Sequence, residues 1–503
     1  MACALSAWRL RPAIRRLCTG AFPLALGILL CSAQTGAASA FPNAEPDAAE
    51  QWYLVQDRAW DHWPSPPTLK TVKVAVIDSG IDYGHPDFAG QIAGGRSFVP
   101  GSSWKTDSNG HGTFVAGLIA ASPFNGIGIA GMAFNAKLLI AKVVQPNGDV
   151  SPAAEASAIE WAVREGARVI NLSLGGTRDP EDSQIDSFSP VERDAIEYAY
   201  SQGAVIVAAV GNSTQAPQTP WPFADYPAAL PNVIGVAALR QDGSVPAWSN
   251  RDKQYVDIAA PGAGMFSTIP RSLVDASQPA CAGQPYSNCG PSELNNAIGT
   301  SFAAPQVSAA AALLLGTDPA LAPDQVMWLL ERSARDMNPS DGCSACPVGR
   351  DALTGWGRLD VAAALTDLEN GIKLPPPDRY EPNDNVGFQA YRLSVPRTIT
   401  DSLDYWDDPV DVYALRLRSG QRLYARLTAA RDARITLELW GPGTTDLTAP
   451  GASTLARSTT VGAQQRLSFQ APATGTYDIA ATDTRATRER AVYQLAVGDS
   501  PPR

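Results

Sequence analysis

Three short segments of this chain carry a serine, a histidine and an aspartate beside glycines and other small residues. Ser301 lies in the segment GTSFAAP, His111 in NGHGT and Asp78 in VIDSG, and each is predicted to lie where a strand or loop meets a helix. A serine hydroxyl needs a base to become a nucleophile at neutral pH, and that base needs an orienting carboxylate. The chain has only three histidines, so the choice of base is narrow. These residues together indicate an acyl-transfer site.

The same segments resemble the catalytic motifs of the subtilisin-like serine proteases, the peptidase S8 family, in that family's order Asp, His, Ser. The resemblance implies that Ser301 attacks the peptide carbonyl, that His111 takes and returns its proton, and that Asp78 orients the imidazole. The segment AVGNS resembles the one that carries the oxyanion-hole asparagine, which assigns that role to Asn212. We therefore expect a secreted serine endopeptidase that works without a catalytic cofactor.

Two further segments resemble the substrate-binding edges of this family. LSLGG resembles the strand that pairs with an extended peptide and walls the first specificity pocket, through Ser173, Leu174 and Gly175. Gly148 and Asp149, in NGDV, resemble the opposing edge. Two edges that clamp a peptide as an added strand bind its main chain, so we expect extended polypeptide substrates. We also expect the enzyme to be a monomer. No charge is identified at the base of the pocket, so a large apolar side chain is expected before the cut.

A structural calcium site is a further expectation from the resemblance. The segments HPD and NGIGI resemble parts of a calcium site in this family, in which side-chain and carbonyl oxygens surround the ion. The candidate ligands are Gln51, Asp87, Asn125, Ile127 and Ile129. The alternative is that these proline- and glycine-rich turns keep their shape without a metal.

Short apolar runs alternate with helical patterns from residue 51 to residue 371. The predicted strands are 72–77, 138–144, 169–174, 204–210, 233–238 and 256–259, and the predicted helices include 113–121, 152–165, 191–201 and 302–315. Such alternation is typical of an α/β fold with a parallel sheet flanked by helices. Ligands bind beyond the carboxyl ends of such strands, which brings the three segments to one edge.

After a proline-rich linker at 372–380 the periodicity changes to two. Tyr413, Leu415 and Leu417 alternate with other residues, and so do Ile435 and Leu437. This pattern predicts a small all-β sandwich over 381–497. The segments YEPND, DVY and GTY resemble the bacterial pre-peptidase C-terminal (PPC) domain. Substrate or carbohydrate docking and a passive role in secretion or stability are both open for it.

The N-terminus predicts export. Four arginines precede an apolar run and the small-residue segment ASA, so residues 1–40 are expected to be a signal peptide. The apolar run is too short for a membrane span. We expect a secreted, extracellular protein, with the periplasm as the alternative compartment. The net charge of −11 argues against nucleic acid and anionic membranes as partners.

Four of the seven cysteines lie beyond the predicted signal peptide, an even number that suits disulfides in an oxidising compartment. The local pairs Cys281–Cys289 and Cys343–Cys346 are the first choice among three connectivities, and a zinc site is the alternative. The first pair lies in an insertion, 271–294, that either rims the cleft or is a plain surface loop.

Phe302 stands where many relatives have a methionine beside the nucleophile, which predicts resistance to peroxide. Two other functions compete with an endopeptidase of this family. One is a catalytically silent secreted binding protein that uses the C-terminal β domain. The other is an acid-stable serine-carboxyl peptidase, which uses a glutamate as base, and the intact GHGT context of His111 argues against it.

Overall fold

The computed structural model describes residues 41, 43–214, 216–274, 292–387, 389–445, 447, 453–458, 462–487 and 490–501. The predicted signal peptide therefore lies outside the described residues, and so do Cys281 and Cys289. In the part of the chain that is described, no helix has the length and apolar character needed to span a bilayer.

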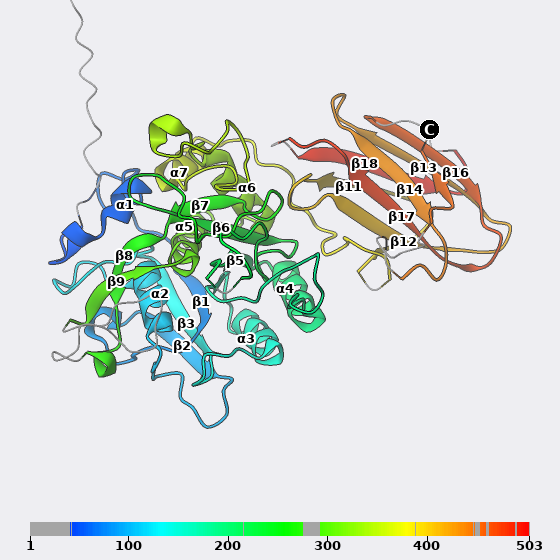
Figure 1. Cartoon of the computed structure of the whole chain (residues 1–503). Coiled ribbons are helices and arrows are strands. Elements are labelled where there is room, and N and C mark those ends of the chain that lie inside the picture. The colour runs from blue at the N-terminus through cyan, green and yellow to red at the C-terminus, as the bar shows by residue number, and fades with distance from the viewer. Residues whose placement is uncertain are drawn as a thin grey trace, which may run out of the picture. The chain divides into compact units, whose positions relative to one another are not determined.

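A seven-stranded parallel sheet forms the centre of the N-terminal region (Figure 1). Its order is β2-β3-β1-β4-β5-β6-β7, and every neighbouring pair is parallel. The strands are β1 (Val72–Asp78), β2 (Ile92–Ser97), β3 (Ala136–Lys142), β4 (Val169–Leu172), β5 (Val205–Ala209), β6 (Val233–Leu239) and β7 (Ile258–Pro261). Strand β1 lies between β3 and β4, so the chain changes direction across the sheet at this strand, the place where α/β folds bind ligands.

Both faces of this sheet are covered, which explains its continuous apolar runs. Val74 and Val76 of β1 belong to the core formed with α2 (His111–Ala120) and α5 (Ala304–Thr317). Ala75 and Ile77 point to the opposite face and the core formed with α3 (Pro152–Arg164) and α4 (Pro190–Ser201). The period-two alternation of β1 thus serves two hydrophobic cores at once.

Helix α5 runs through the middle of the first core. Of its 14 residues, 13 are buried, and most of them are alanine or leucine. Small side chains let the neighbouring strands and helices approach closely, and α5 contacts β1, β4, β5 and α2. Helices α6 (Pro323–Ser333) and α7 (Val361–Glu369) pack on the same core, and so does the short α1 (Trp52–Gln56), which precedes β1 in the chain.

Several elements were not predicted from the sequence. Strand β2 reads IAGGRS, which has neither an apolar run nor an alternating pattern, and it forms by pairing with β3. Strands β8 (Ala263–Thr268) and β9 (Leu294–Ile298) form a separate antiparallel pair beside α2.

The C-terminal region consists of two packed β-sheets. The five-stranded sheet has the order β10-β12-β17-β14-β15 and the four-stranded sheet β11-β18-β13-β16. All neighbouring pairs are antiparallel except β10 with β12. The strands are β10 (Tyr391–Leu393), β11 (Arg397–Leu403), β12 (Val410–Leu417), β13 (Arg422–Ala429), β14 (Ile435–Trp440), β15 (Ala456–Arg457), β16 (Gln464–Gln470), β17 (Gly475–Asp483) and β18 (Ala491–Gly498).

The core of this region lies between the two sheets. Leu415 and Leu437 come from the five-stranded sheet, and Leu427 and Leu495 from the four-stranded one. The predicted fold class, a parallel sheet with flanking helices followed by a small all-β sandwich, is confirmed.

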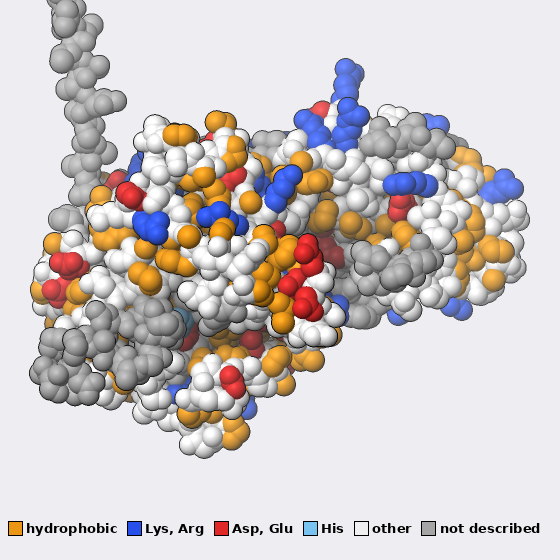
Figure 2. All heavy atoms as spheres, viewed as in Figure 1, with side chains coloured by type: hydrophobic (Ala, Val, Ile, Leu, Met, Phe, Trp, Pro, Cys, Tyr) orange, Lys and Arg blue, Asp and Glu red, His pale blue; other side chains and the backbone are white. Residues whose placement is uncertain are grey.

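On the face drawn in Figure 2, acidic and basic side chains of the described residues are interspersed, and they form no broad basic surface there.

Candidate active site

Asp78 and His111 form a buried pair at the carboxyl edge of the parallel sheet. Asp78 is the last residue of β1 and His111 the first of α2. His111 Nδ1 lies 2.9 Å from Asp78 Oδ1 and 2.8 Å from Oδ2, and the backbone N–H of Ser79 donates to Oδ1 over 2.7 Å. Asp78 is 1% exposed. A carboxylate held in this way fixes the proton on Nδ1 and leaves Nε2 as the base.

The charges around His111 favour its protonated form. Burial lowers the pKa of His111, but attraction by Asp78, its hydrogen bond and the charge of Asp107 outweigh burial and raise that pKa above the usual 6.5. A base with a raised pKa holds the serine proton more readily during the reaction.

Asp107 organises the loop that leads into α2. Its carboxylate accepts five hydrogen bonds, from the hydroxyls of Ser79 and Thr113 and from the backbone N–H groups of Asn109, Gly110 and Thr113. It therefore caps the start of the helix that carries His111. Gly110 has φ +94°, a conformation that favours glycine and completes the turn.

A chain of buried hydrogen bonds positions the backbone of Ser301. Ser308 Oγ donates to Asn171 Oδ1 over 2.9 Å, and Asn171 Nδ2 donates to Ser173 Oγ over 2.9 Å. Ser173 Oγ in turn donates to the Ser301 carbonyl over 2.7 Å. The chain links β4 and α5 to the short 3-10 turn Thr300–Phe302 that carries the serine. Ser173, predicted to bind substrate, thus also contacts the backbone of the predicted nucleophile.

The side-chain amide of Asn212 is oriented by Thr300. Asn212 Oδ1 accepts from the Thr300 N–H over 3.0 Å and from the Thr300 hydroxyl over 3.3 Å. Because the oxygen is used in this way, Nδ2 is the atom left to donate toward the cleft. A donor fixed before the reaction is what a developing oxyanion requires.

These residues line one cleft of about 500 Å³. The cleft brings together the predicted catalytic residues, the predicted oxyanion donor and both predicted substrate-binding edges: Asp78, His111, Ser301, Asn212, Gly148, Asp149, Ser173, Leu174 and Gly175. Phe302 is fully buried behind it, with its ring centre 5.3 Å from that of His111 and 4.5 Å from that of Phe114.

The predicted calcium ligands also lie together, and they hydrogen-bond to one another. Asp87 accepts from the Asn125 side chain over 3.1 Å and from the Ile129 N–H over 3.2 Å, while Asn125 Oδ1 accepts from the Ile127 N–H over 2.8 Å. Gln51 Oε1 accepts from the Ala130 N–H over 3.0 Å. Burial, with the charges of Glu45 and Asp47, raises the pKa of Asp87 to about 6, so a cation would relieve its environment.

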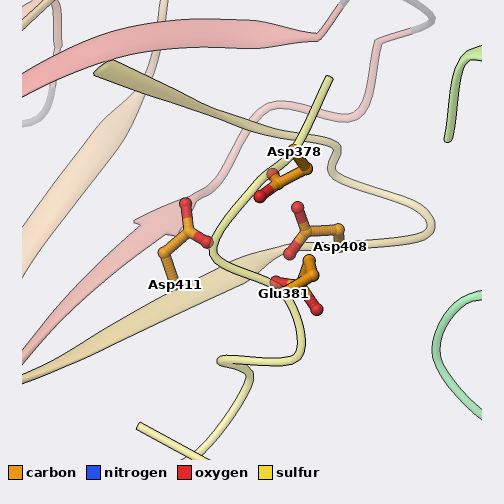
Figure 3. A group of neighbouring side chains, drawn as sticks. All are labelled: Asp378, Glu381, Asp408 and Asp411. Atoms are coloured by element: carbon orange, nitrogen blue, oxygen red, sulfur yellow. The ribbon is translucent and has the colours of Figure 1, made fainter. Parts of the chain in front are cut away.

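A second acidic group lies in the C-terminal region. Asp378, Glu381, Asp408 and Asp411 each offer an oxygen within 4.8 Å of the others, and Figure 3 shows the four carboxyl groups around a common space. At least one oxygen of each has no hydrogen-bond partner, and Asp408 lacks partners for both. Burial and mutual repulsion raise the pKa of Glu381, Asp408 and Asp411 far above the usual value. Oxygen ligands of this kind suit a divalent cation such as Ca²⁺.

Cys343 and Cys346 form a disulfide with Cα atoms 5.4 Å apart. Four residues that contact the predicted site were not predicted from the sequence: Asp107, Asn171, Ser308 and Asp225, the last of which lines the cleft. Asp107 had a local signal, because an acidic residue just before a helix is a common cap. Asn171, Ser308 and Asp225 gain their roles only through long-range packing.

Comparison with known proteins agrees with this geometry. The profile of the subtilase family matches residues 69–357. Subtilisin DY of Bacillus licheniformis is 36% identical over 269 residues, which cover 54% of this chain and 85% of the relative. Thermitase of Thermoactinomyces vulgaris is 37% identical over 243 residues, which cover 48% of this chain and 74% of the relative.

Among solved structures, that of a lanthipeptide protease matches with a TM-score of 0.51 and 23% identity, over 64% of this chain and 95% of the other. That likeness shows the shared fold. The family profile and the two sequence relatives lead to one conclusion: the chain belongs to the subtilase family and is a serine-type endopeptidase.

Proposed function

We propose that this protein is a secreted endopeptidase that hydrolyses peptide bonds of extended polypeptides through an acyl-enzyme on Ser301. The observation that carries the proposal is the cleft itself, which is lined at once by the Asp78–His111 pair, Ser301 and Asn212. A base, an orienting carboxylate, a nucleophile and an oxyanion donor are the parts that acyl transfer requires.

In the first step His111 Nε2 takes the hydroxyl proton of Ser301 as Oγ attacks the peptide carbonyl. Asp78 stabilises the imidazolium that results. The tetrahedral intermediate carries a negative charge on the former carbonyl oxygen, which the Asn212 amide and the Ser301 backbone N–H stabilise. His111 then gives its proton to the leaving amine as the C–N bond breaks, which leaves the acyl group on Ser301. In the second half of the reaction His111 takes a proton from water, the water oxygen attacks the acyl carbonyl, and the acid and the Ser301 hydroxyl are released.

The substrate main chain is held between two edges of the cleft. Leu174 and Gly175 form one edge, and Gly148 and Asp149 the other. A peptide added between them as a strand is recognised mainly through its backbone, so the enzyme cuts extended or unfolded segments.

Labelling with a fluorophosphonate tests the mechanism. The purified chain is expected to react at Ser301 and to cleave unfolded casein, and Ser301→Ala is expected to lose both. Asn212→Ala is expected to keep the label and to lose about 10²–10³ in turnover. A chain that neither labels nor cleaves would be the catalytically silent binding protein instead.

We further propose a structural calcium ion at Gln51, Asp87, Asn125, Ile127 and Ile129. The support is the hydrogen-bond network that brings Asp87, Asn125, Ile127 and Ile129 together, and the raised pKa of Asp87. Calcium would order the turn between α2 and β3. Titration of the apo-protein with Ca²⁺, with Asp87→Asn as the control, tests this site.

The chain is proposed to comprise a signal peptide at 1–40, a peptidase domain at 51–371, a linker at 372–380 and a PPC-like domain at 381–497. The change from a parallel sheet to stacked β-sheets supports the last boundary. N-terminal sequencing of protein recovered from the culture medium tests secretion and the cleavage position.

A further inference from the structure

One carboxylate in the cleft has no part in the acyl-transfer steps. Asp225 is 6% exposed and lines the cleft with Leu174, Gly175 and Gly211. Leu174 and Gly175 belong to the proposed substrate-binding edge, and Gly211 directly precedes Asn212. Asp225 therefore lies between these two walls of the pocket that adjoins Ser301. Any side chain at Gly211 would collide with the Asp225 carboxylate, and φ +94° there also favours glycine. The wall is therefore shaped around this carboxylate.

The protein supplies little to balance the charge of Asp225. Its Oδ1 has no hydrogen-bond partner, and no ion pair among the described residues includes it. The adjacent Arg178 commits its guanidinium to Asp252, with Nη1 3.0 Å from Oδ2. Asn250 lies beside it, fully buried, and neither atom of its amide makes a hydrogen bond of normal geometry. Burial raises the pKa of Asp225 to about 8, against smaller lowering effects of the Arg178 backbone and Asn250.

A buried carboxylate that no cation balances is costly, and a cation removes that cost. The pocket between Leu174 and Gly211 is part of the cleft that Ser301 lines, so we assign it to the side chain of the substrate residue just before the scissile bond. We propose that Asp225 determines specificity in this pocket by pairing with an arginine or lysine at that substrate position. The proposal rests on the proteolytic function proposed above and replaces the apolar preference expected from the sequence.

The expected size of the preference for a basic residue follows from the unpaired Asp225 carboxylate that a neutral substrate side chain would leave in the pocket. A phenylalanine in the pocket would cover Asp225 without pairing with it, whereas a guanidinium would donate hydrogen bonds to a carboxylate in a water-poor site. Sites built for a polar partner discriminate strongly against substrates that lack it. We expect kcat/KM to favour arginine or lysine over phenylalanine by about 10²-fold.

The test uses the full chain and peptide p-nitroanilides that differ only in the residue before the cut: Arg, Lys, Phe or Leu. The wild-type protein should prefer the two basic substrates. Asp225→Asn should lose about 10²-fold on them, so that its rates on the basic and the phenylalanine substrates become similar. Benzamidine, a small aromatic cation, should inhibit the wild-type protein competitively and the variant weakly.

Two controls separate the ways to fail. Asp194→Asn makes the same chemical change at an exposed position of α4 and should not alter the preference for arginine and lysine over phenylalanine and leucine. Labelling by a fluorophosphonate counts working active sites in each protein. No labelling of the wild-type protein would refute the proposed function, whereas labelling with a preference for Phe or Leu would refute only the role of Asp225. An equal loss of Asp225→Asn on all four substrates would refute it too, and the wild-type comparison decides alone if the variant does not fold.

Discussion

The buried carboxylates of the catalytic cleft and those of the C-terminal region differ in what surrounds them. Asp78 and Asp107 are held by backbone N–H groups, hydroxyls and an imidazole. Asp408 and Asp411 face mainly other carboxylates, with three of their four oxygens unpartnered. The difference teaches that burial alone does not define a carboxylate's role. A satisfied carboxylate orients its neighbours, whereas an unsatisfied one requires a ligand or a proton.

The largest effect is expected from removing the charge of Asp78 without changing its shape. Asp78→Asn presents an amide to His111 Nδ1, stabilises the wrong tautomer and should lower kcat/KM by about 10⁴-fold. Rates on a peptide substrate, normalised to folded protein by circular dichroism, measure the loss. A variant that keeps more than a tenth of the activity would show that Asp78 does not orient His111.

Removing the carboxylate of Asp107 should cost stability more than chemistry. Asp107→Ala leaves five donors without their acceptor, and we expect a loss of about 3 kcal/mol. Thermal unfolding in the Ser301→Ala background avoids self-digestion during the measurement. The exposed Asp194→Ala is the matched control and should leave the unfolding temperature in place. Equal stability of both variants would contradict the capping role.

The C-terminal acidic group should respond to divalent ions. At 100 times its dissociation constant, Ca²⁺ should stabilise the fold by about 2.7 kcal/mol, which raises the unfolding temperature by about 5 °C over the chelated protein. Asp408→Asn should lose most of this response. Because calcium is also proposed to bind at Asp87, the comparison is made in the Asp87→Asn background.

The pH dependence of the chelated protein has a definite sign. The folded-state pKa values of Glu381, Asp408 and Asp411 are raised, so their protonated forms are favoured by folding. Their contribution to stability is present below the unfolded pKa near 4 and is lost as pH rises through the folded values. Calcium should prevent that loss, and a calcium response that persists at pH 3 would point to another site.

A smaller effect is expected on the acid limb of activity. His111 must be neutral to act as a base, and its pKa is raised, so kcat/KM should rise with pH at a midpoint above 6.5. Asp107→Asn removes one of the charges that raise this pKa and should move the midpoint down by about half a unit, or roughly 0.7 kcal/mol. Both proteins are compared in the Asp225→Asn background with a leucine or phenylalanine substrate, so that titration of Asp225 does not contribute. An upward shift would contradict the assigned electrostatics.

The smallest effect is expected from peroxide on the wild-type protein. Phe302 has no sulfur and is fully buried beside His111, so activity should stay largely intact. Phe302→Met introduces an oxidisable thioether at the same place and should make activity decay with peroxide. A rapid loss in the wild-type protein would show that another group near the cleft is oxidised.

Features that depend on neighbouring residues could be predicted from the sequence. The α/β region and the β sandwich followed from periodicity, because strands buried on both faces and strands buried on one face differ in pattern. Asp78, His111 and Ser301 stand in short motifs, and the cleft they line is consistent with the roles predicted for them. The triad, the oxyanion donor and the calcium ligands stay predictions until their variants are measured.

Contacts between residues far apart in the sequence could not be predicted, and the reason is physical. Asp225 lies in an irregular stretch between β5 and β6, and its place in the pocket depends on the approach of Gly175 and Gly211. Asn171 and Ser308 are hydrogen-bonded across 137 positions of sequence. No window of neighbouring residues contains either relation, because both are created by packing.

The almost complete burial of α5 ties the nucleophile to the whole peptidase region. Ser301 lies in the turn that leads into α5, a helix in contact with α2, α6, α7 and strands β1 and β3 to β7 of the parallel sheet, so its backbone cannot relax without opening the central core. Reactivity in such a molecule is cooperative with folding: a chain with an incomplete core presents no working serine. Burial of α5 therefore couples activity to complete folding, and a partly folded peptidase region is expected not to cleave neighbouring polypeptides.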